Sequence, residues 1–451
     1  MDATTLRLAE TVARMDLATL SDETVTQAKR RIVDAIACAM GAFEEPFCET
    51  IRGVSARYSG TSTARIWGTD LVSSVEMAGF ANGTVMRYLD LNDTFLGASA
   101  GHPSDMIPAL IALAEATGAS GAALIGAIVA AYELYCGLCD ATALGPQGLD
   151  QSTGAALGAA GGASRLLGLD VPATGNAIAL AVGANLNLYN VRCGTLSDWK
   201  ACAGPNGARN GVFAALLARE GVTGPTAVFD GKGGLSTVLQ PLAFRDDPTA
   251  PPRLLETRLK AYPVCYHGQS AVDAAIELAA KIDPAQVARV LVETYEASAK
   301  MMGGDPTRWA PETRETADHS LPFTVGVALT TGRLTSGDYA AARLVDPELR
   351  AFMAKIEVRE CAEMSDTYPA RNHTRITVML ADGQGLSAER LQPKGHPDNP
   401  LSQEELGEKL ANLWPGAVLP GARVAQVIGL VDGLDRAASV APLVDALCPR
   451  G

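Results

Sequence analysis

The sequence predicts a mainly α-helical protein with an added α+β part: a large all-helical domain and a smaller α+β lid domain with an antiparallel sheet. Through the first ~260 residues, apolar side chains recur at helical spacing. After Pro263, several short segments instead alternate apolar and polar residues in the manner of half-buried strands. A chain of 451 residues is also too long for one compact core, so two domains are expected.

The helical domain is expected to span residues 1–262 and to be completed by residues 396–451. Within residues 23–42, the apolar residues of one predicted helix fall on a single face: Val25, Ile32, Ile36 and Met40. Residues 152–169 are dominated by Ala and Gly. Small side chains let helix axes approach closely, so this helix is expected to be tightly packed at the centre of the domain.

The lid domain is expected to span residues 263–395. Its strands are predicted in three segments with alternating residues: 289–297, 354–360 and 374–380. A turn after the third strand leads into another extended segment, and two helices are expected to begin near His319 and Asp346. This order of elements indicates an α+β arrangement, with an antiparallel sheet covered by helices.

The composition of the chain argues against several classes of partner. The formal net charge is −13 and the pI is near 5.0, and such a field repels nucleic acid and anionic membranes. No uninterrupted apolar run approaches the ~18 residues of a membrane-spanning helix. The first residues lack the apolar core of a signal peptide, and an odd number of cysteines, nine, argues against a disulfide framework. A cytoplasmic protein is therefore expected.

Metal-binding and nucleotide-binding motifs are missing from the sequence. None of the five histidines has the spacing of a zinc motif such as HExxH, and there is neither a Walker A motif nor a GxGxxG after a predicted strand. Cys136 and Cys139 form a CxxC inside an apolar helix without a second pair nearby, so a place in the core is favoured over zinc. No metal or nucleotide cofactor is expected.

Residues 88–105 contain the first cluster of candidate catalytic residues. The candidates in this irregular segment between two predicted helices are Asp90, Asp93, Thr94 and His102. Hydrogen-bonding groups near a histidine orient it and tune its pKa for acid–base catalysis. Helix capping is the alternative, because Asp, Thr and Ser are common at helix ends. From the residues alone, the two interpretations are balanced.

Three further segments offer charged or hydrogen-bonding side chains. Lys200 precedes a Gly-rich approach to a helix. There it would hold a carboxylate, or serve as an acid if its pKa is lowered, or simply lie in solvent. The predicted domain junction, a favoured place for ligand sites, contains Lys260, Tyr262, His267 and Gln269. Asp318 and His319 precede a predicted helix. They would either cap this helix or belong to a functional site.

The residue types in these segments suit one kind of chemistry. They are His, Lys, Arg and Asp without a metal motif. No pair of carboxylates has a convincing glycosidase spacing, and no nucleophile elbow is present. Proton transfer at a carbon next to a carboxylate, with cations binding the acid groups, fits this set.

Five segments in this order resemble the MmgE/PrpD family, and the resemblance covers essentially the whole chain. They are YLDLNDTF with the following GHPSDMIPALIALAE, SDWKACAGPNGARNGVFAALLA, YPVCYHGQSAVDAAIEL, RETADHSLPF and GHPDNPLSQEELGEKL. The resemblance implies a helical domain with an α+β lid, a homodimer, and no metal, iron–sulfur cluster or nucleotide. Members of this family perform 2-methylcitrate dehydration, cis-aconitate decarboxylation and iminodisuccinate epimerisation, so a small polycarboxylic acid is the expected substrate.

By motif position, the resemblance places six residues in the pocket: Asp90, Thr94, His102, Lys200, Lys260 and His267. His102 and His267 are then the acid–base candidates, and Asp90 would orient and polarise the reacting groups. Lys200 and Lys260 would stabilise charge on the substrate, and Thr94 would form a hydrogen bond to it. Three residues of the same motifs are further candidates for substrate binding: Asp93, Tyr262 and His319.

Gln151 departs from the family pattern. It stands where the resemblance leads us to expect a histidine, and Asp150 precedes it. Glutamine cannot exchange a proton near neutral pH, whereas histidine can. This departure favours an epimerisation or a different hydro-lyase substrate. Alternatively, Gln151 only binds a carboxylate or hydroxyl of the substrate.

The leading hypothesis is a cofactor-independent hydro-lyase of the 2-methylcitrate dehydratase type, which abstracts a proton next to a carboxylate. The enzymatic alternatives are an iminodisuccinate-like epimerase and a cis-aconitate-like decarboxylase, while a zinc enzyme rests only on the CxxC. A catalytically silent helical binding module is the non-enzymatic alternative. The presence of His102, Lys200 and His267 in their motifs argues against it, because a scaffold has no need of them.

Overall fold

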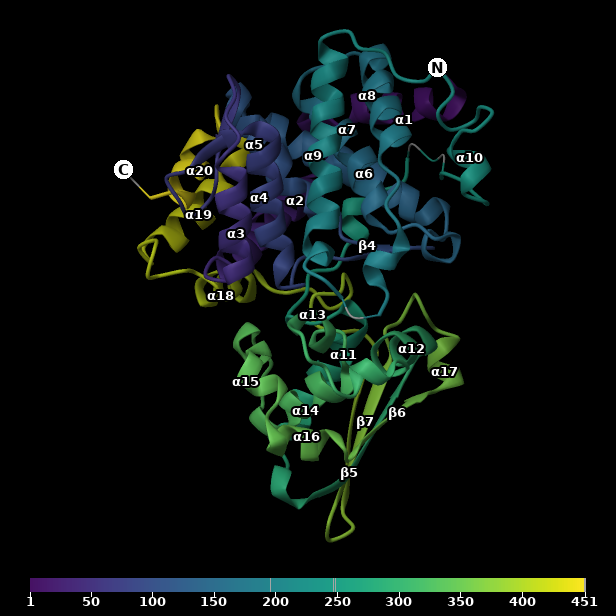
Figure 1. Cartoon of the computed structure of the whole chain (residues 1–451), viewed down its shortest axis with the longest axis vertical. Helices are drawn as coiled ribbons and strands as arrows, with labels where there is room; N and C mark the ends of the chain where they lie inside the picture. The colour runs from purple at the N-terminus through teal and green to yellow at the C-terminus, as the bar shows by residue number, and fades with distance from the viewer. Residues whose placement is uncertain (195, 246, 248, 450–451) are drawn as a thin grey trace.

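The computed structural model describes residues 1–194, 196–245, 247 and 249–449. Figure 1 shows a helical upper body, which contains both chain termini, and a lower body built around a sheet. The core of the lower body consists of buried residues between Val264 and Ala388, and buried residues from Leu401 onward rejoin the core of the upper body. The predicted fold class, mainly helical with an α+β part, is confirmed.

The upper body contains thirteen α-helices in the part of the chain that the structure describes. They are α1 (Ala3–Arg14), α2 (Asp22–Gly41), α3 (Pro46–Ser55), α4 (Val75–Tyr88), α5 (Ile107–Thr117), α6 (Gly121–Ala141), α7 (Ser152–Leu166), α8 (Val171–Ala184), α9 (Trp199–Arg219), α10 (Leu235–Val238), α18 (Gln403–Asn412), α19 (Arg423–Asp432) and α20 (Ala441–Leu447).

The close packing predicted for residues 152–169 is present between α7 and α9. A Cβ atom added to Gly211 of α9 would lie 2.4 Å from the carbonyl oxygen of Ala156, and one on Gly207 would lie 2.8 Å from that of Ser152. Only glycine allows backbones to approach this closely. The long helix α9 is thereby fixed against the centre of the upper body, with its first turn, which contains Lys200, at the lower end.

Helix α6 is long and apolar enough to cross a membrane by length and composition. However, 83% of its most apolar window is buried inside the protein, as in the core helix of a globular domain. The CxxC of Cys136 and Cys139 lies in this helix, and both thiols are fully buried. The structure therefore supports a place in the core for these two cysteines.

The lower body combines helices with a four-stranded sheet. Its elements are α11 (Gln269–Ala279), β5 (Val287–Thr294), α12 (Glu296–Gly303), α13 (Arg314–Ala317), α14 (Leu321–Thr331), α15 (Ala341–Leu344), α16 (Pro347–Met353), β6 (Ile356–Glu360), α17 (Ala362–Ser365), β7 (Thr374–Leu380) and β8 (Gly385–Arg390). The strand order is β6-β5-β7-β8. Buried residues at alternate positions of β5 and β7, such as Val290, Val292 and Ile376, face the helices.

The sheet differs from the prediction in one pairing. β5–β7 and β7–β8 are antiparallel as expected, but β5 and β6 are parallel, with Val292 opposite Val358. The chain between these two strands contains α12 to α16, which is long enough for the crossover that parallel strands require. The predicted strand 289–297 is also too long, because Glu296 already begins α12.

The upper body contains two short hairpins that the helical pattern did not predict. β1 (Thr63–Arg65) pairs with β2 (Val72–Ser74), and β3 (Phe95–Leu96) pairs with β4 (Ala100–Gly101). The second hairpin lies within the polar segment 88–105. Next to it, Thr94 exchanges backbone hydrogen bonds of 2.8 and 2.7 Å with Arg258. The segment is thus fixed against the chain that leads into the lower body.

Candidate active site

A cavity of about 250 Å³ lies where the two bodies meet. Its walls come from the segment after α4, from the regions between α6 and α7 and between α8 and α9, and from lower-body residues between Lys260 and His319. Seven of the ten predicted site residues line it: Asp90, Thr94, His102, Gln151, Lys260, His267 and His319. A cavity at such a junction is a favoured position for a small-molecule site.

Asp90 is the centre of a buried ion-pair network. Its φ is 51°, in the left-handed region that non-glycine residues rarely adopt. Oδ1 accepts hydrogen bonds from Arg87 at 2.6 Å and from Lys260 at 2.7 Å, while Lys200 lies 3.3 Å from Oδ2. Burial alone would raise the pKa of Asp90, but the cations Arg87, Lys200 and Lys260 hold this pKa well below its ordinary 3.8. Asp90 is therefore ionised at neutral pH.

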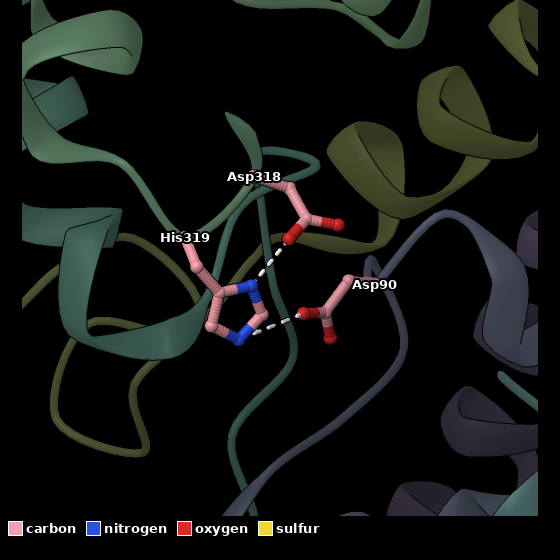
Figure 2. Close-up of side chains that lie close together, drawn as sticks. All are labelled: Asp90, Asp318 and His319. Carbon is pink, nitrogen blue, oxygen red and sulfur yellow. Dashed lines mark hydrogen bonds and ion pairs between the residues drawn. The ribbon is translucent and has the colours of Figure 1, made fainter. Parts of the chain in front are cut away.

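His319 lies between the carboxylates of Asp90 and Asp318 (Figure 2). Nδ1 contacts Oδ1 of Asp318, and Nε2 lies 3.8 Å from Oδ2 of Asp90. Burial and Lys200 lower the pKa of His319, but the Cys265 thiol and Asp318 outweigh them, and the net shift is upward from 6.5. A histidine held in this way is a candidate proton donor.

Lys200 joins the two bodies through this network. Its ammonium donates to both oxygens of Asp318 at 2.9 Å and lies 3.4 Å from Nδ1 of His319. The side chain is only 3% exposed. The alternative of a solvated surface lysine is therefore wrong.

Asp90, Asp318 and His319 are also close enough together for a metal ion, with ligand atoms within 4.8 Å of one another. The two carboxylates, however, already neutralise Lys200 and Lys260 at 2.7–3.3 Å. A divalent cation would have to displace these ammonium groups, since like charges repel strongly in a buried site. The three residues fit an ion-pair network better than a cation site.

His102 faces the cavity as a neutral imidazole. Its Nδ1 lies 2.8 Å from the backbone carbonyl oxygen of Asp93, which can only accept, so Nδ1 holds the hydrogen and Nε2 keeps a free lone pair. Thr94 Oγ1 lies 3.3 Å from the same Nδ1. Burial, followed by the charges of Arg87 and Lys260, holds the pKa of His102 well below 6.5. The group is available as a base.

His267 is the third imidazole of the cavity. Nδ1 lies 2.8 Å from the hydroxyl oxygen of Tyr295, which accepts a hydrogen bond of 3.1 Å from the Asn372 amide. Burial, followed by His319 and Lys260, lowers the pKa of His267 to about 4. His267 is therefore also neutral, and its ring is fixed by the lower body.

Gln151 lies beside His102. Its Oε1 accepts hydrogen bonds from the Tyr135 hydroxyl and, at 3.3 Å, from the backbone N–H of His102. The Nε2 atom is buried and has no hydrogen-bond partner among the described residues. An unpaired donor at the cavity wall fits the interpretation in which Gln151 binds a polar group of the substrate.

Three predicted residues do not line the cavity. Lys200 lies directly behind Asp90, as described above. Asp93 accepts hydrogen bonds from the Tyr132 hydroxyl at 2.7 Å and from the backbone of Ser104 at 3.0 Å, so it supports the loop. Tyr262 directs its hydroxyl to Asp273 at 2.9 Å. The Tyr262 side chain therefore does not contribute to the cavity wall.

Neither of the α-helices that follow these two segments is capped by a candidate residue. Helix α14 is capped by the Ser320 hydroxyl, which accepts from the backbone of Phe323 at 3.1 Å, rather than by Asp318 or His319. Helix α5 has no side-chain cap from the polar segment 88–105.

Several charged or reactive groups of the cavity were missed from the sequence. Arg87 lies in the last turn of α4, three residues before Asp90. Arg192 pairs with Asp150 at 2.8 Å, and no local pattern marks a contact between residues so far apart in the chain. Cys265 contacts His319; burial raises the pKa of this thiol, but His319 outweighs burial and the net shift is downward. Arg308 is the remaining cation of the wall.

Comparison with known proteins agrees with this geometry. The profile of the MmgE/PrpD N-terminal domain matches residues 6–243, and that of the MmgE/PrpD C-terminal domain matches residues 262–432.

This chain belongs to the MmgE/PrpD family.

Three known proteins are similar to most of this chain. A 2-methylcitrate dehydratase of Cupriavidus necator is 29% identical over 425 residues, which cover 86% of each chain. A 2-methylcitrate dehydratase of Escherichia coli strain K12 is 28% identical over 382 residues, 78% of this chain and 77% of the relative. The human cis-aconitate decarboxylase is 26% identical over 413 residues, 86% of this chain and 83% of the relative. All three are named for a catalysed reaction, and the chain is accordingly an enzyme.

Proposed function

We propose that this enzyme is a hydro-lyase of the 2-methylcitrate dehydratase type that acts on a small polycarboxylic acid. The observation that carries the proposal is the opposite tuning of two histidines in one cavity. The pKa of His102 is held well below 6.5, whereas the pKa of His319 is raised above it. Environments that push titratable groups apart in this way assign a base and an acid at the same pH.

His102 is the proposed base. Its free Nε2 removes a proton from the carbon next to a substrate carboxylate, and the imidazolium that forms keeps its Nδ1–H bond to the Asp93 carbonyl oxygen. Thr94 and Gln151 flank this histidine and are proposed to bind polar groups of the substrate.

The buried network supplies positive charge for the carbanion-like state. Four cationic groups, Arg87, Lys200, Lys260 and protonated His319, surround the two carboxylates of Asp90 and Asp318. Cationic groups are thus gathered at this site in a protein whose formal net charge is −13. Fixed positive charge beside a reacting carboxylate stabilises the negative charge that develops on it.

His319 is the proposed acid. As the carbon–oxygen bond breaks, its proton passes to the departing hydroxyl group, a double bond forms between the two carbons, and water leaves. This assignment differs from the sequence-based hypothesis, which paired His102 with His267. The pKa of His267 is about 4, so His267 is neutral and better suited to donate a hydrogen bond to the substrate through Nε2.

The names of the relatives supply a second candidate. Cis-aconitate decarboxylase of Homo sapiens is similar over 86% of this chain, so decarboxylation of an unsaturated tricarboxylate is the principal alternative. An epimerase of the iminodisuccinate type would need only the removal and return of a proton, without the loss of a hydroxyl group. Gln151, with its unpaired Nε2, stands where a histidine was expected. This replacement is the feature that most affects the choice between dehydration, decarboxylation and epimerisation.

A panel assay separates these reactions. Chelator-treated enzyme is incubated in D2O with 2-methylcitrate, citrate, cis-aconitate and iminodisuccinate, and the proton NMR spectra are followed. A new alkene signal at the expense of a hydroxy acid is the expected result for a metal-independent hydro-lyase. Loss of carbon dioxide from cis-aconitate, or deuterium uptake without net conversion, would replace the proposal by decarboxylation or epimerisation.

Three further properties belong to the same proposal. We expect a homodimer in the cytoplasm, and the domains are assigned to residues 1–262 with 396–451 and to residues 263–395. The two bodies of the structure are compatible with this division.

A further inference from the structure

Arg308 differs from the other cations that line the cavity. In the part of the chain that the structure describes, each of the others has a carboxylate oxygen within 4 Å of a side-chain nitrogen. The distances are 2.6 Å for Arg87, 2.8 Å for Arg192 and 2.7 Å for Lys260. For Arg308 the same part of the chain provides no such carboxylate, and its Nε and Nη1 atoms have no hydrogen-bond partner. The residue is only 5% exposed. A buried guanidinium without an acceptor is costly, which indicates that a ligand supplies the acceptor.

The backbone of Arg308 is held close to the proposed acid. Its carbonyl oxygen accepts a hydrogen bond from the Ser320 hydroxyl, and Ser320 directly follows His319 and caps α14. Arg308 is the last residue of a short 3-10 turn, Pro306–Arg308, whose first residue follows the capping Asp305. The guanidinium therefore extends from a fixed point on the wall that belongs to the lower body.

Three other donors of the cavity wall lack a hydrogen-bond partner among the described residues, and one of them, Nε of Arg87, lies 3.6 Å from an Asp105 carboxylate oxygen. The Tyr266 hydroxyl is buried and has no partner within the described ranges, and neither does Nε2 of Gln151. Together with Arg308, these groups offer hydrogen bonds from both bodies but contain no carboxylate. They are suited to an anionic ligand, because a guanidinium binds a carboxylate through two parallel hydrogen bonds.

A packing role explains the neighbouring Arg314 but not Arg308. Arg314 also lacks a carboxylate partner among the described residues, yet it lies 5.1 Å from the Tyr88 ring centroid and 5.0 Å from that of Tyr339. It also contacts the Leu89 carbonyl oxygen at 3.5 Å. Aromatic rings stabilise a buried arginine. In the structure described, no ring lies over Arg308, and Arg308 lines the cavity whereas Arg314 does not.

We propose that Arg308 binds a carboxylate of the substrate beyond those held by the Asp90–Lys200–Lys260 network, and that it selects tricarboxylates over dicarboxylates. The inference rests on the proposed function, since it names the substrate class of the same site. The reacting part of the substrate lies against His102, His319 and the network, and its additional carboxylate reaches across the cavity to the guanidinium. Removal of Arg308 then weakens tricarboxylates selectively.

The test compares two unreactive acids by calorimetric titration. Propane-1,2,3-tricarboxylate has the additional carboxylate, and 2-methylsuccinate has a methyl group in place of its carboxymethyl arm. Arg308→Gln is expected to weaken the tricarboxylate at least ~10-fold, because hydrogen bonds to charged groups are among the strongest. Its affinity for 2-methylsuccinate should change less than about twofold, and Arg308→Lys should restore part of the lost affinity.

Controls distinguish selectivity from damage to the fold. Arg343→Gln removes a half-buried guanidinium of the same body that pairs with Asp346 outside the cavity, and it should leave both affinities unchanged. If Arg308→Gln weakens both acids equally, or neither, the inference is wrong while the proposed function stands. If the unmodified enzyme binds neither acid, the proposed substrate class itself is wrong.

Discussion

Lys260 binds Asp90 twice: its ammonium donates at 2.7 Å to the Asp90 carboxylate and at 2.7 Å to the Asp90 backbone carbonyl oxygen. Asp90 is the one described non-glycine residue with a positive φ, 51°. A strained backbone of this kind persists only where its surroundings hold it in place. The pair therefore connects a strained loop of the upper body to the chain that enters the lower body.

Replacement of Asp90 by asparagine should lower kcat/KM at least ~10²-fold, as for other groups that set up acid–base catalysis. Asparagine tolerates the left-handed conformation, so the backbone is retained and the effect reports the lost charge. The exposed Asp382→Asn is the matched control. Steady-state kinetics with thermal unfolding of both variants provide the measurement. A kcat/KM close to that of the unmodified enzyme would remove Asp90 from the mechanism.

The loss of activity at high pH, the alkaline limb of the pH profile, should follow the deprotonation of His319. Activity that needs the protonated imidazole is complete below the pKa of His319 and is lost as the pH rises through this raised pKa, above 6.5. The acidic limb should lie well below 6.5, because the pKa of His102 is strongly lowered. The charged or titratable groups facing His319 are Lys200, Asp318, Asp90, Cys265 and His267.

Cys265→Ser tests the origin of that limb. The interaction with Cys265 raises the pKa of His319, so removal of this thiol should move the alkaline limb to lower pH while the acidic limb stays in place. The buried Cys448→Ser is the control, because the charged neighbours of Cys448 are Arg65, Glu115 and Asp445, none of which lines the cavity. A limb that does not move in Cys265→Ser would mean that another group is the acid.

Lys409 is expected to act as a positioning residue. From α18 its ammonium donates to Asp34 at 2.5 Å and to the backbone carbonyl oxygens of Leu91 at 3.0 Å and Lys260 at 2.8 Å. Lys409→Met should lower the free energy of unfolding by ~3–5 kcal/mol, because it leaves the buried Asp34 carboxylate unpaired. The double variant with Asp34→Leu should recover most of this stability but not the full kcat, because the Lys260 carbonyl contact stays lost. Full recovery of both quantities would limit Lys409 to a role in stability.

Gln151→His should change the ratio of activities across the acid panel. The new imidazole would lie beside His102 and would add a group that exchanges protons near neutral pH. Gln384→His, in an exposed turn, serves as the control. Ratios that agree within about twofold between Gln151→His and the unmodified enzyme would show that this position does not determine the reaction.

The helical body and the main site loop are predictable because their patterns are local. The alternation of residues 374–380 matches β7 residue for residue, and the polar segment 88–105 contains Asp90 and His102 close together in sequence. The pairing of Lys200 with Asp318 spans 118 residues, and only the resemblance to a family brought its two segments into one site.

Other features depend on the three-dimensional arrangement of the chain and have no local pattern in the sequence. The contact of Arg192 with Asp150 and the parallel pairing of β5 with β6 are of this kind. The role of His319 was underestimated for a similar reason. Its raised pKa comes from Cys265 and Asp318 after burial and Lys200 have lowered it, and this balance depends on distances in the folded chain.

The most direct test of the base and acid assignments is a comparison of His102→Gln and His319→Gln with 2-methylcitrate in D2O, followed by proton NMR. Without its acid, His319→Gln should still exchange the proton next to the carboxylate for deuterium but should form alkene at least ~10²-fold more slowly. His102→Gln should lose both exchange and alkene formation. Exchange that persists in His102→Gln, or alkene formation that persists in His319→Gln, would contradict the account.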